Sequence, residues 1–347
     1  MTAALPRRAW AATHRFRPVL LILAALFLLF GVTQEGFLDA TNLRNLLTGV
    51  SILWVLALGM TFVLISAGVD LSAAAIVALA GVFLARALGA GAPPGVAIVL
   101  TVLFGGLVGA GVNGLLIGRL GLSFFVVTLG SMTALTGIVS LWSQTETQFV
   151  TARLLREIGM GSILGIATPI WIMAATLLVA LWIQHRTYLG RDIYAVGGSR
   201  VAARLAGIRT VRTTVVVYGI SGLCAGIAAL IAVGRIGAAS PQVDNAIALQ
   251  AAAAVLLGGT SLMGGAGGVG GTVFGVLFIG VLQNGLSIAG VQSFWQQVVT
   301  GVILVLAVLG DRISAAGGVR PLIAAARARL AATADRPSDT ANEGSSA

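Results

Sequence analysis

A run of glycines late in the chain is the first feature that suggests chemistry. Residues 255–275 read VLLGGTSLMGGAGGVGGTVFG, and the six residues from Gly265 to Gly270 match G-x-G-x-x-G. In a dinucleotide site this pattern needs an acidic residue about 20 positions further on, which holds the ribose. The chain has no Asp or Glu between Asp244 and Asp311, and it has no lysine to serve a phosphate-binding loop. The sequence therefore argues against a nucleotide site in this chain.

Residues for catalysis or metal binding are scarce as well. The two histidines, His14 and His185, lie far apart in the sequence, and the single cysteine, Cys224, lies within an apolar run. General acid–base chemistry and metal binding both need several such side chains close together. We therefore predict no catalytic residue, no metal site and no cofactor of its own.

The polar side chains inside the apolar runs are mostly uncharged. Neutral donors and acceptors suit an uncharged polyhydroxyl solute, although each could instead form a hydrogen bond between helices. Ion-coupled carriers usually place carboxylates or histidines inside the membrane, whereas Asp70 comes at the end of an apolar run. The neutral residues are Asn113, Thr128, Gln250, Gln283, Asn284, Gln296 and Gln297. The candidates for a substrate pathway are Asn113, Asn284, Gln283, Thr128, Asp70 and Ser72.

The elements that position these residues are predicted from hydropathy. The 347 residues are 58% hydrophobic and only 9% charged, whereas soluble domains carry about 25% charged residues. Apolar runs of about 20 residues, the length that crosses a bilayer, recur along the chain, and they do not alternate as the strands of a membrane β-barrel do. We expect an all-α polytopic membrane protein with ten spans: 19–33, 46–66, 72–90, 95–117, 124–142, 167–184, 212–233, 246–263, 268–288 and 293–310.

The net charge of +10 comes from arginine alone. Most arginines fall in segments that are cytoplasmic if the N-terminus is cytoplasmic, which is the positive-inside pattern and not a nucleic-acid footprint. Both termini are therefore predicted to be cytoplasmic, and the first span is interpreted as an uncleaved helix and not a signal peptide. The predicted organisation is an N-terminal segment 1–18, a transmembrane domain 19–310 and a C-terminal tail 311–347 whose end is disordered.

A local pattern, G-x-x-x-N-G-L-x-I, occurs at residues 109–117 and again at residues 280–288. The two copies fall in the fourth and ninth expected spans. An odd number of five spans per repeat makes the two halves inverted, which is typical of transporters with a pathway at the repeat interface. The pattern places Asn113 and Asn284 at equivalent positions. We expect both to face the pathway, or else to bond neighbouring helices.

The glycines between the eighth and ninth expected spans have a structural interpretation. Small residues let helices approach closely in lipid, and a break in a helix is tolerated there only where protein or a water-filled cavity covers it. We interpret Gly258, Gly259, Gly264, Gly265 and Gly267 as a tight, inward-facing turn between packed helices.

Residues 186–212 form the longest cytoplasmic segment between expected spans. After a break at Gly197–Gly198, Val201, Leu205 and Ile208 follow helical spacing and predict a short helix with an apolar stripe. Such a helix suits a groove in another subunit or a surface of anionic lipid. The sequence leaves both open.

Four stretches resemble one family: GMTFVLISAGVDLSAAAIVALAG at residues 59–81, FFVVTLGSM at 124–132, YLGRDIYAVGGSRVAARLAGI at 188–208, and the glycine-rich stretch 251–286. Together they resemble the permease subunits of sugar-importing ABC transporters of the ribose type, over about residues 37–312. One departure is the Ala73-Ala74-Ala75 run after Asp70-Leu71-Ser72, where the family often carries Val, Gly and Ser.

The resemblance implies the inner membrane of a bacterium, a permease dimer, a separate ATPase subunit that binds ATP, and a periplasmic or lipid-anchored sugar-binding protein. It implies import of a monosaccharide such as ribose. The alternatives are an ABC permease for a branched-chain amino acid or an autoinducer-like sugar, an ion-coupled sugar carrier, and a membrane scaffold. The ATPase-coupling residues that it implies are Gly190, Arg191, Arg200, Ala203, Arg204, Leu205 and Gly207.

Overall fold

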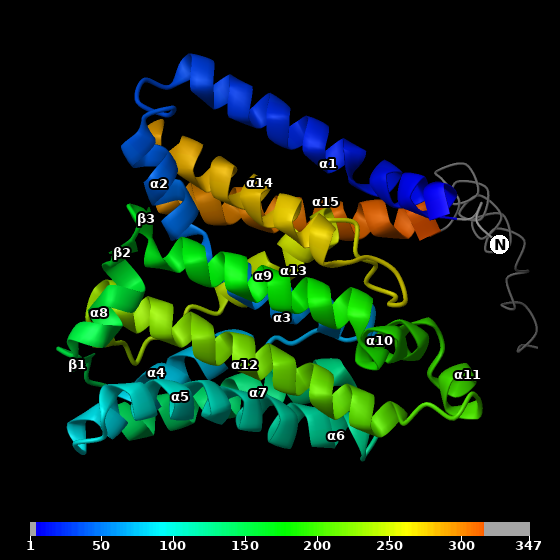
Figure 1. The fold of residues 1–347 in the computed structure, drawn as a ribbon, viewed down its shortest axis with the longest axis horizontal. Coiled ribbons are helices and arrows are strands. Elements are labelled where there is room, and N and C mark those ends of the chain that lie inside the picture. The colour runs from blue at the N-terminus through cyan, green and yellow to red at the C-terminus, as the bar shows by residue number, and fades with distance from the viewer. Residues whose placement is uncertain (1–4, 316–347) are drawn as a thin grey trace, which may run out of the picture.

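The computed structural model describes the backbone of residues 5–315 and the side chains of residues 19–311. Figure 1 shows long helices that run along the long axis of the molecule. The helices α10 and α11 lie at one end, together with both ends of the described chain, and α2 and α8 lie at the other. Most of the predicted tail, including the end expected to be disordered, lies outside the described residues.

The helices follow the expected apolar runs. Over the described residues they are α1 (Leu5–Thr33), α2 (Ala40–Gly49), α3 (Ser51–Ile65), α4 (Ala73–Gly89), α5 (Pro94–Val108), the π-helix η1 (Gly109–Gly114), α6 (Leu115–Gly118), α7 (Phe124–Ser143), α8 (Arg153–Met160), α9 (Thr168–Arg186), α10 (Tyr188–Gly198), α11 (Arg200–Leu205), α12 (Thr210–Ile236), α13 (Ala246–Leu257), α14 (Val269–Ile288) and α15 (Ser293–Ala315). Four two-residue strands pair as β1 (Gln148–Phe149) with β4 (Ala238–Ala239) and β2 (Ser162–Ile163) with β3 (Ile166–Ala167), both antiparallel.

Six of the described helices are long and apolar enough to cross a membrane, and the bent pair α2–α3 makes a seventh if it is counted as one span. Shorter apolar helices are the part of α1 over Val19–Thr33, α4 and α13. This establishes a helical, multi-pass membrane protein.

Two expected spans differ in shape from the prediction. The expected span 46–66 is two helices that meet at a bend of 41° next to Val50. The expected span 246–263 ends early, because α13 stops at Leu257 and a turn begins at Gly258, followed by Gly259 with positive φ. Hydropathy detects an apolar run, but it does not detect where the backbone leaves the helix inside that run.

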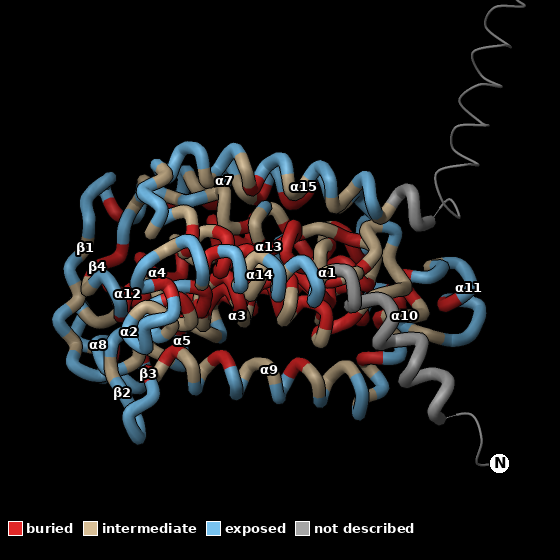
Figure 2. Tube along the Cα trace, turned by 90° about the horizontal axis from the view of Figure 1, so that it is seen from above, coloured by how far each residue is buried: buried red, intermediate tan, exposed pale blue. Residues whose placement is uncertain are grey.

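The helices α3 and α12 form the centre of the bundle. In the apolar stretch of α12, 61% of the residues are buried, against 17% in that of α9 and 6% in that of α15. In Figure 2 the buried residues gather around α3 and α13, while α9 and α15 show mostly exposed or half-buried outer faces. The peripheral helices therefore present apolar side chains outward, as helices in lipid do.

Glycines allow α12 to approach α5 and η1 closely. A Cβ added at Gly105 would collide with the carbonyl oxygen of Gly222, and one added at Gly109 would collide with that of Tyr218. In the opposite direction, a Cβ at Gly226 would press on Val102. Small residues at a helix interface are the usual means of close packing in a membrane.

Candidate functional site

A polar cavity opens between the starts of α3, α13 and α15 and the end of α14, towards the end of the molecule that carries α2. Its volume is about 350 Å³. Most of its polar lining consists of neutral amides and one hydroxyl: Asn45, Gln250, Gln283, Asn284, Ser287 and Gln296. We call this the amide cavity. It brings together four of the neutral residues found by sequence, Gln250, Gln283, Asn284 and Gln296.

Asn284 also bonds a neighbouring helix. Its amide nitrogen donates to the Oδ1 atom of Asn42 at 3.0 Å, and the Asn42 amide donates back to Asn284 at 3.0 Å. Both side chains are only part-buried. Asn284 therefore contacts another helix, which is one of the two alternatives that the sequence left open, and it also lines a cavity; that it faces a pathway stays a prediction.

Asp70, Ser72 and Asn113 come together in a different place, a buried cluster between α4, η1 and α12. The Oδ1 atom of Asp70 accepts from the Ser72 hydroxyl at 2.6 Å and from the Ser72 backbone N–H at 3.1 Å. Its Oδ2 atom accepts from the hydroxyl of Ser221 on α12 at 2.7 Å. Asp70 has no exposed surface. These hydrogen bonds offset part of the free-energy cost of burying the carboxyl group, which would be larger without partners.

The position of Asp70 corrects one inference from the sequence, that the spans enclose essentially no carboxylate. Ser221, its partner, lies near the middle of α12, so the short loop between α3 and α4 carries Asp70 into the bundle. The linear sequence places Asp70 at the end of an apolar run, where a carboxylate would be expected at the membrane surface. It does not show that the end of α3 is itself buried, so that Asp70 lies inside the bundle.

Asn113 lies in the π-helix and completes the buried cluster. Its amide nitrogen donates to the Ser72 hydroxyl oxygen at 2.7 Å and lies 3.4 Å from Oδ1 of Asp70. Its Oδ1 atom is buried without a hydrogen-bond partner among the described residues. A π-helix with an unpaired buried oxygen is the kind of irregularity that often accompanies function.

Thr128 lies outside both groups. It is buried in α7, and its hydroxyl donates to the carbonyl of Phe124 in its own helix at 2.9 Å. The residues that the sequence did not single out are Asn42, Asn45, Ser221 and Ser287. Asn42 and Asn45 precede the expected second span, and serines within apolar runs gave no distinguishing signal.

The glycine-rich turn, residues 258–268, is tight, as expected from the sequence. Gly264, Gly265 and Gly267 have positive φ, a conformation that side chains other than glycine rarely adopt. The N–H of Gly265 donates to the carbonyl of Ile65 at the end of α3 at 2.8 Å. The turn therefore connects α13 to α14 and at the same time contacts the other half of the chain.

Three further elements hold this turn in place. The Gln184 side chain on α9 accepts from the N–H of Val269 at 2.8 Å. The Tyr194 hydroxyl on α10 donates to the carbonyl of Gly267 at 2.7 Å. On α15, Asp311 accepts from the N–H of Leu262 at 3.0 Å. Burial raises the pKa of the Tyr194 phenol above its ordinary value, so the hydroxyl keeps its proton and remains a donor at neutral pH.

The segment α10–α11 packs against the end of the bundle. A Cβ added at Gly197 would collide with the carbonyl of Ile65. On its other side, Arg200 donates to the carbonyl of Gly118 at 3.2 Å, where α6 ends, a favourable place for a cation. The segment therefore contacts the end of α3, which bonds the glycine-rich turn, and the end of α6, which follows the π-helix.

The residues expected to couple to an ATPase divide into two groups. Gly190 and Ala203 are buried against the bundle, Arg200 is half-buried, and Gly207 has a positive φ of 81° after α11. Facing outward are Val201, Leu205, Arg191 and Arg204, with Leu205 85% exposed and Val201 72% exposed. The predicted stripe is shorter than expected, because α11 ends at Leu205 and Ile208 lies beyond it.

The fold and these sites define an integral membrane protein with polar groups enclosed in a helical bundle. Residues 42–308 match the family model described as the permease component of the branched-chain amino acid transport system. The chain belongs to this permease family.

Named relatives cover nearly the whole chain. The ribose import permease protein RbsC of Escherichia coli (strain K12) is 37% identical over 308 residues, covering 88% of this chain and 95% of that protein. RbsC of Bacillus subtilis (strain 168) is 38% identical, covering 83% and 89%. The D-allose transport system permease protein AlsC of Escherichia coli (strain K12) is 35% identical, covering 84% and 90%. No solved structure matches the chain significantly.

Proposed function

We propose that the chain is the membrane permease subunit of a binding-protein-dependent, ATP-driven importer of a monosaccharide such as ribose. The relatives named for ribose and D-allose transport, each at least 35% identical and covering most of both chains, support this assignment. The amide cavity carries it structurally, because its lining offers neutral donors and acceptors without a fixed charge. A sugar that loses water there regains hydrogen bonds of about 0.5–1.5 kcal/mol each.

The contacts between helices support ten spans arranged as two inverted repeats. In the first half α4 packs on α5, α7 and α12, and in the second half α13 packs on α14, α15 and α3. These sets match if α3, α4, α5 and α7 correspond to α12, α13, α14 and α15. The shorter helices α1, α4 and α13 then complete the spans that length alone does not count.

In this arrangement α10–α11 is the docking site for the ATPase. It lies at the same end as both ends of the described chain (Figure 1), the end that the positive-inside pattern assigns to the cytoplasm. Its exposed Val201 and Leu205 form an apolar spot beside Arg204, which suits a groove on a partner. Movement of this segment would reach the glycine-rich turn through Tyr194 and Gly197.

The remaining partners follow from the same proposal. A second permease copy completes the translocation pathway, a periplasmic or lipid-anchored binding protein delivers the sugar at the end that carries α2 and α8, and ATP is bound and hydrolysed by the ATPase subunits.

The docking proposal is tested by Leu205→Asp. The carboxylate should abolish the apolar contact, so that the ATPase no longer co-purifies and uptake of labelled ribose falls, while the permease still inserts. The matched control, read by co-purification of the ATPase alone, is Leu164→Asp at the opposite end, because Leu164 is 89% exposed and Leu205 is 85% exposed. Co-purification of the ATPase with Leu205→Asp at the wild-type level would refute the docking site.

The substrate proposal is tested separately. Proteoliposomes that contain the permease, its ATPase and the cognate binding protein should accumulate a monosaccharide from a panel of ribose, allose, xylose and arabinose, and should not accumulate leucine. Accumulation of leucine alone would overturn the sugar assignment and leave the docking site intact.

A further inference from the structure

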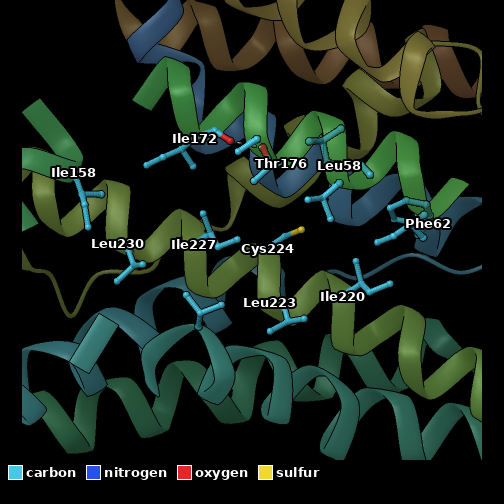
Figure 3. A pocket seen from close by; sticks show the side chains of 15 residues that line it. Leu58, Phe62, Ile158, Ile172, Thr176, Ile220, Leu223, Cys224, Ile227 and Leu230 are labelled. Carbon is cyan, nitrogen blue, oxygen red and sulfur yellow. Dashed lines mark hydrogen bonds between the residues drawn. The ribbon is translucent and has the colours of Figure 1, made fainter. Parts of the chain in front are cut away.

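A large apolar cavity opens between α9 and α12, with α3 and α5 behind it (Figure 3). Its volume is about 490 Å³. Figure 3 shows Ile220, Leu223 and Ile227 of α12 lining it, with Ile172 and Thr176 of α9 on the opposite side and Cys224 at its centre. Its lining is almost entirely hydrocarbon, which excludes a sugar or an ion as the occupant.

The cavity lies along α9, a helix long and apolar enough to cross a membrane. Its α9 wall contains Ala175 and Val179, which are exposed, and the neighbouring Leu178 is 67% exposed. The side chains of α9 therefore face lipid on one side and the cavity on the other. Trp182, 60% exposed in the last turns of α9, is a residue type that collects at the membrane surface.

A second cavity, of about 460 Å³, lies between α10 and the start of α12. Its charged lining residues are Arg209, Arg212 and one carboxylate, Asp192, and the ring of Tyr188 also lines it. Both arginines are exposed, and α9 ends nearby with His185 and Arg186 in its last turn. The net charge around this cavity is therefore positive.

The two cavities follow one another along one face of α12, with α9 opposite the apolar cavity and α10 opposite the charged one. Val216 lines the charged cavity and Ile220 lines the apolar one, and residues four apart lie on the same face of a helix. On the other wall, Leu189 lines the charged cavity and Ile183 the apolar one. The two cavities together offer an apolar stretch followed by a positively charged end, and we treat them as one groove.

We infer that this groove binds one anionic phospholipid, with an acyl chain in the apolar cavity and the phosphate at Arg209 and Arg212. The amphiphilic shape of the groove and the sign of its charge match a lipid with a negative headgroup. Basic pockets between membrane helices on the cytoplasmic side are known to bind such headgroups. The inference goes beyond the transport function, since it assigns a ligand to a surface that lies outside both polar sites.

The lipid site shares residues with the coupling segment α10–α11. Tyr188, Leu189 and Asp192 of α10 form one wall of the headgroup cavity, so a bound lipid fills the space between α10 and α12. The lipid would therefore steady the segment proposed to contact the ATPase.

The test measures lipid retention by native mass spectrometry of the purified full chain. The protein is incubated with equal amounts of dioleoyl phosphatidylglycerol and dioleoyl phosphatidylcholine, which have the same tails. We expect one phosphatidylglycerol per chain to be retained selectively. Arg209→Gln/Arg212→Gln should weaken its binding about thirtyfold, because each arginine near an anionic lipid surface contributes about 1 kcal/mol.

Two matched controls test the binding of the headgroup and of the acyl chain separately. Arg119→Gln/Arg204→Gln removes the same charge from exposed arginines outside the groove and should leave the selectivity unchanged. Ala175→Phe fills the apolar cavity and should lower the retention of both lipids, whereas Ala174→Phe changes an exposed α9 residue that does not line it. Equal loss with both arginine pairs, or with both alanine positions, would overturn the site.

The wild-type chain offers an independent measurement that needs no variant. Cys224 is its single cysteine and lies in the cavity, so a phosphatidylglycerol that carries a diazirine in one acyl chain should, on irradiation, label the peptide that contains Cys224. The matching phosphatidylcholine should label it less. Equal labelling by the two lipids, or labelling spread evenly over the other membrane helices, would overturn the inference.

Discussion

The two copies of the repeated pattern, around Asn113 and around Asn284, share the residues of that pattern but differ in helix type, burial and contacts. Asn113 lies in a π-helix, has no exposed surface and contacts Ser72 in the buried cluster around Asp70. Asn284 lies in the regular helix α14, is half-buried, pairs with Asn42 and lines the amide cavity. The first copy is closed and lies beside a buried carboxyl group, whereas the second lies beside an open cavity whose polar side chains are neutral.

The glycines of the pattern show why the same letters give two environments. Gly109 and Gly114 fit against the backbone of α12, at Tyr218 and Val215. The equivalent Gly280 and Gly285 fit against side chains, those of Val50 and Phe30. The motif therefore specifies close packing in both halves. What it packs against decides whether the neighbouring asparagine is sealed in or left beside a cavity.

The largest expected difference is in accessibility to water. In a Cys224→Ala background, Asn284→Cys should react readily with a small water-soluble thiol reagent. Asn113→Cys should react on the order of a hundredfold more slowly, because it must wait for local opening that costs about 3 kcal/mol. Rates are followed by mass shift, and gel filtration checks that both variants are folded. Equal rates would remove the distinction between the two copies, and a dependence on nucleotide state in the assembled transporter would show that the site opens during transport.

Removing one hydrogen-bond acceptor from each of the two regions should give clearly different losses of stability. Asp70→Ala leaves the hydroxyls of Ser72 and Ser221 without their acceptor, at about 1–3 kcal/mol for each buried unsatisfied group, so we expect a loss of at least about 2 kcal/mol. Asn42→Ala breaks a part-buried pair that water in the cavity can replace, and should cost less than about 1 kcal/mol. Unfolding midpoints in detergent compare the two, and a smaller effect at Asp70 would contradict the buried-cluster account.

The glycines give a smaller, graded test. Gly109→Ala sets a methyl group against backbone, which cannot move aside, and should cost near the upper end of the usual 1–3 kcal/mol for overpacking. Gly280→Ala meets a methyl group of Val50, which is β-branched and gives way only by a change of rotamer or a small helix shift, and should cost less, about 1–2 kcal/mol. The control is Gly111→Ala in the same π-helix, where a Cβ meets nothing within 4 Å. Stability measured by thermal unfolding should rank the variants in this order, and a Gly111→Ala as damaging as Gly109→Ala would attribute the effect to backbone conformation instead.

The smallest effect is expected in transport kinetics. Gln283→Ala removes one hydrogen-bonding side chain from the amide cavity, and the loss of about 0.5–1.5 kcal/mol should change the sugar concentration for half-maximal uptake about two- to tenfold. Folding should be unaffected, because Gln283 is half-buried. Thr128→Val, a buried position outside the cavity, serves as the control. Unchanged kinetics in Gln283→Ala with altered kinetics in Thr128→Val would move the pathway away from the amide cavity.

The sequence predicted the class of protein and most helices, because a bilayer-length apolar run leaves few alternatives. It also predicted the glycine-rich turn, since clustered glycines interrupt any helix. It did not predict that α13 stops at Leu257 or that the loop after α3 carries Asp70 inward, because both depend on which segments cover these residues in three dimensions. The roles of Asn113, Asn284 and the coupling residues stay predictions.

The sequence predicted only part of the amide cavity, which groups Gln250, Gln283, Asn284 and Gln296. Their neutrality was evident, and so was their location in apolar runs. Their convergence was not, because they come from three helices whose rotation is set by packing at positions such as Gly280 and Val50. Hydropathy gives no information about that rotation.

The hydrogen bonds of Asp70 have a consequence for how the chain is made. Its partner Ser221 follows 151 residues later, and Asn284 follows its partner Asn42 by 242 residues. During synthesis the loop after α3 therefore enters or waits at the membrane with the Oδ2 atom of Asp70 lacking its partner, and its hydrogen bonds are complete only once α12 has been inserted. The first half of the protein is thus an assembly intermediate that depends on the second, and a chain interrupted before α12 should be a substrate for membrane quality control.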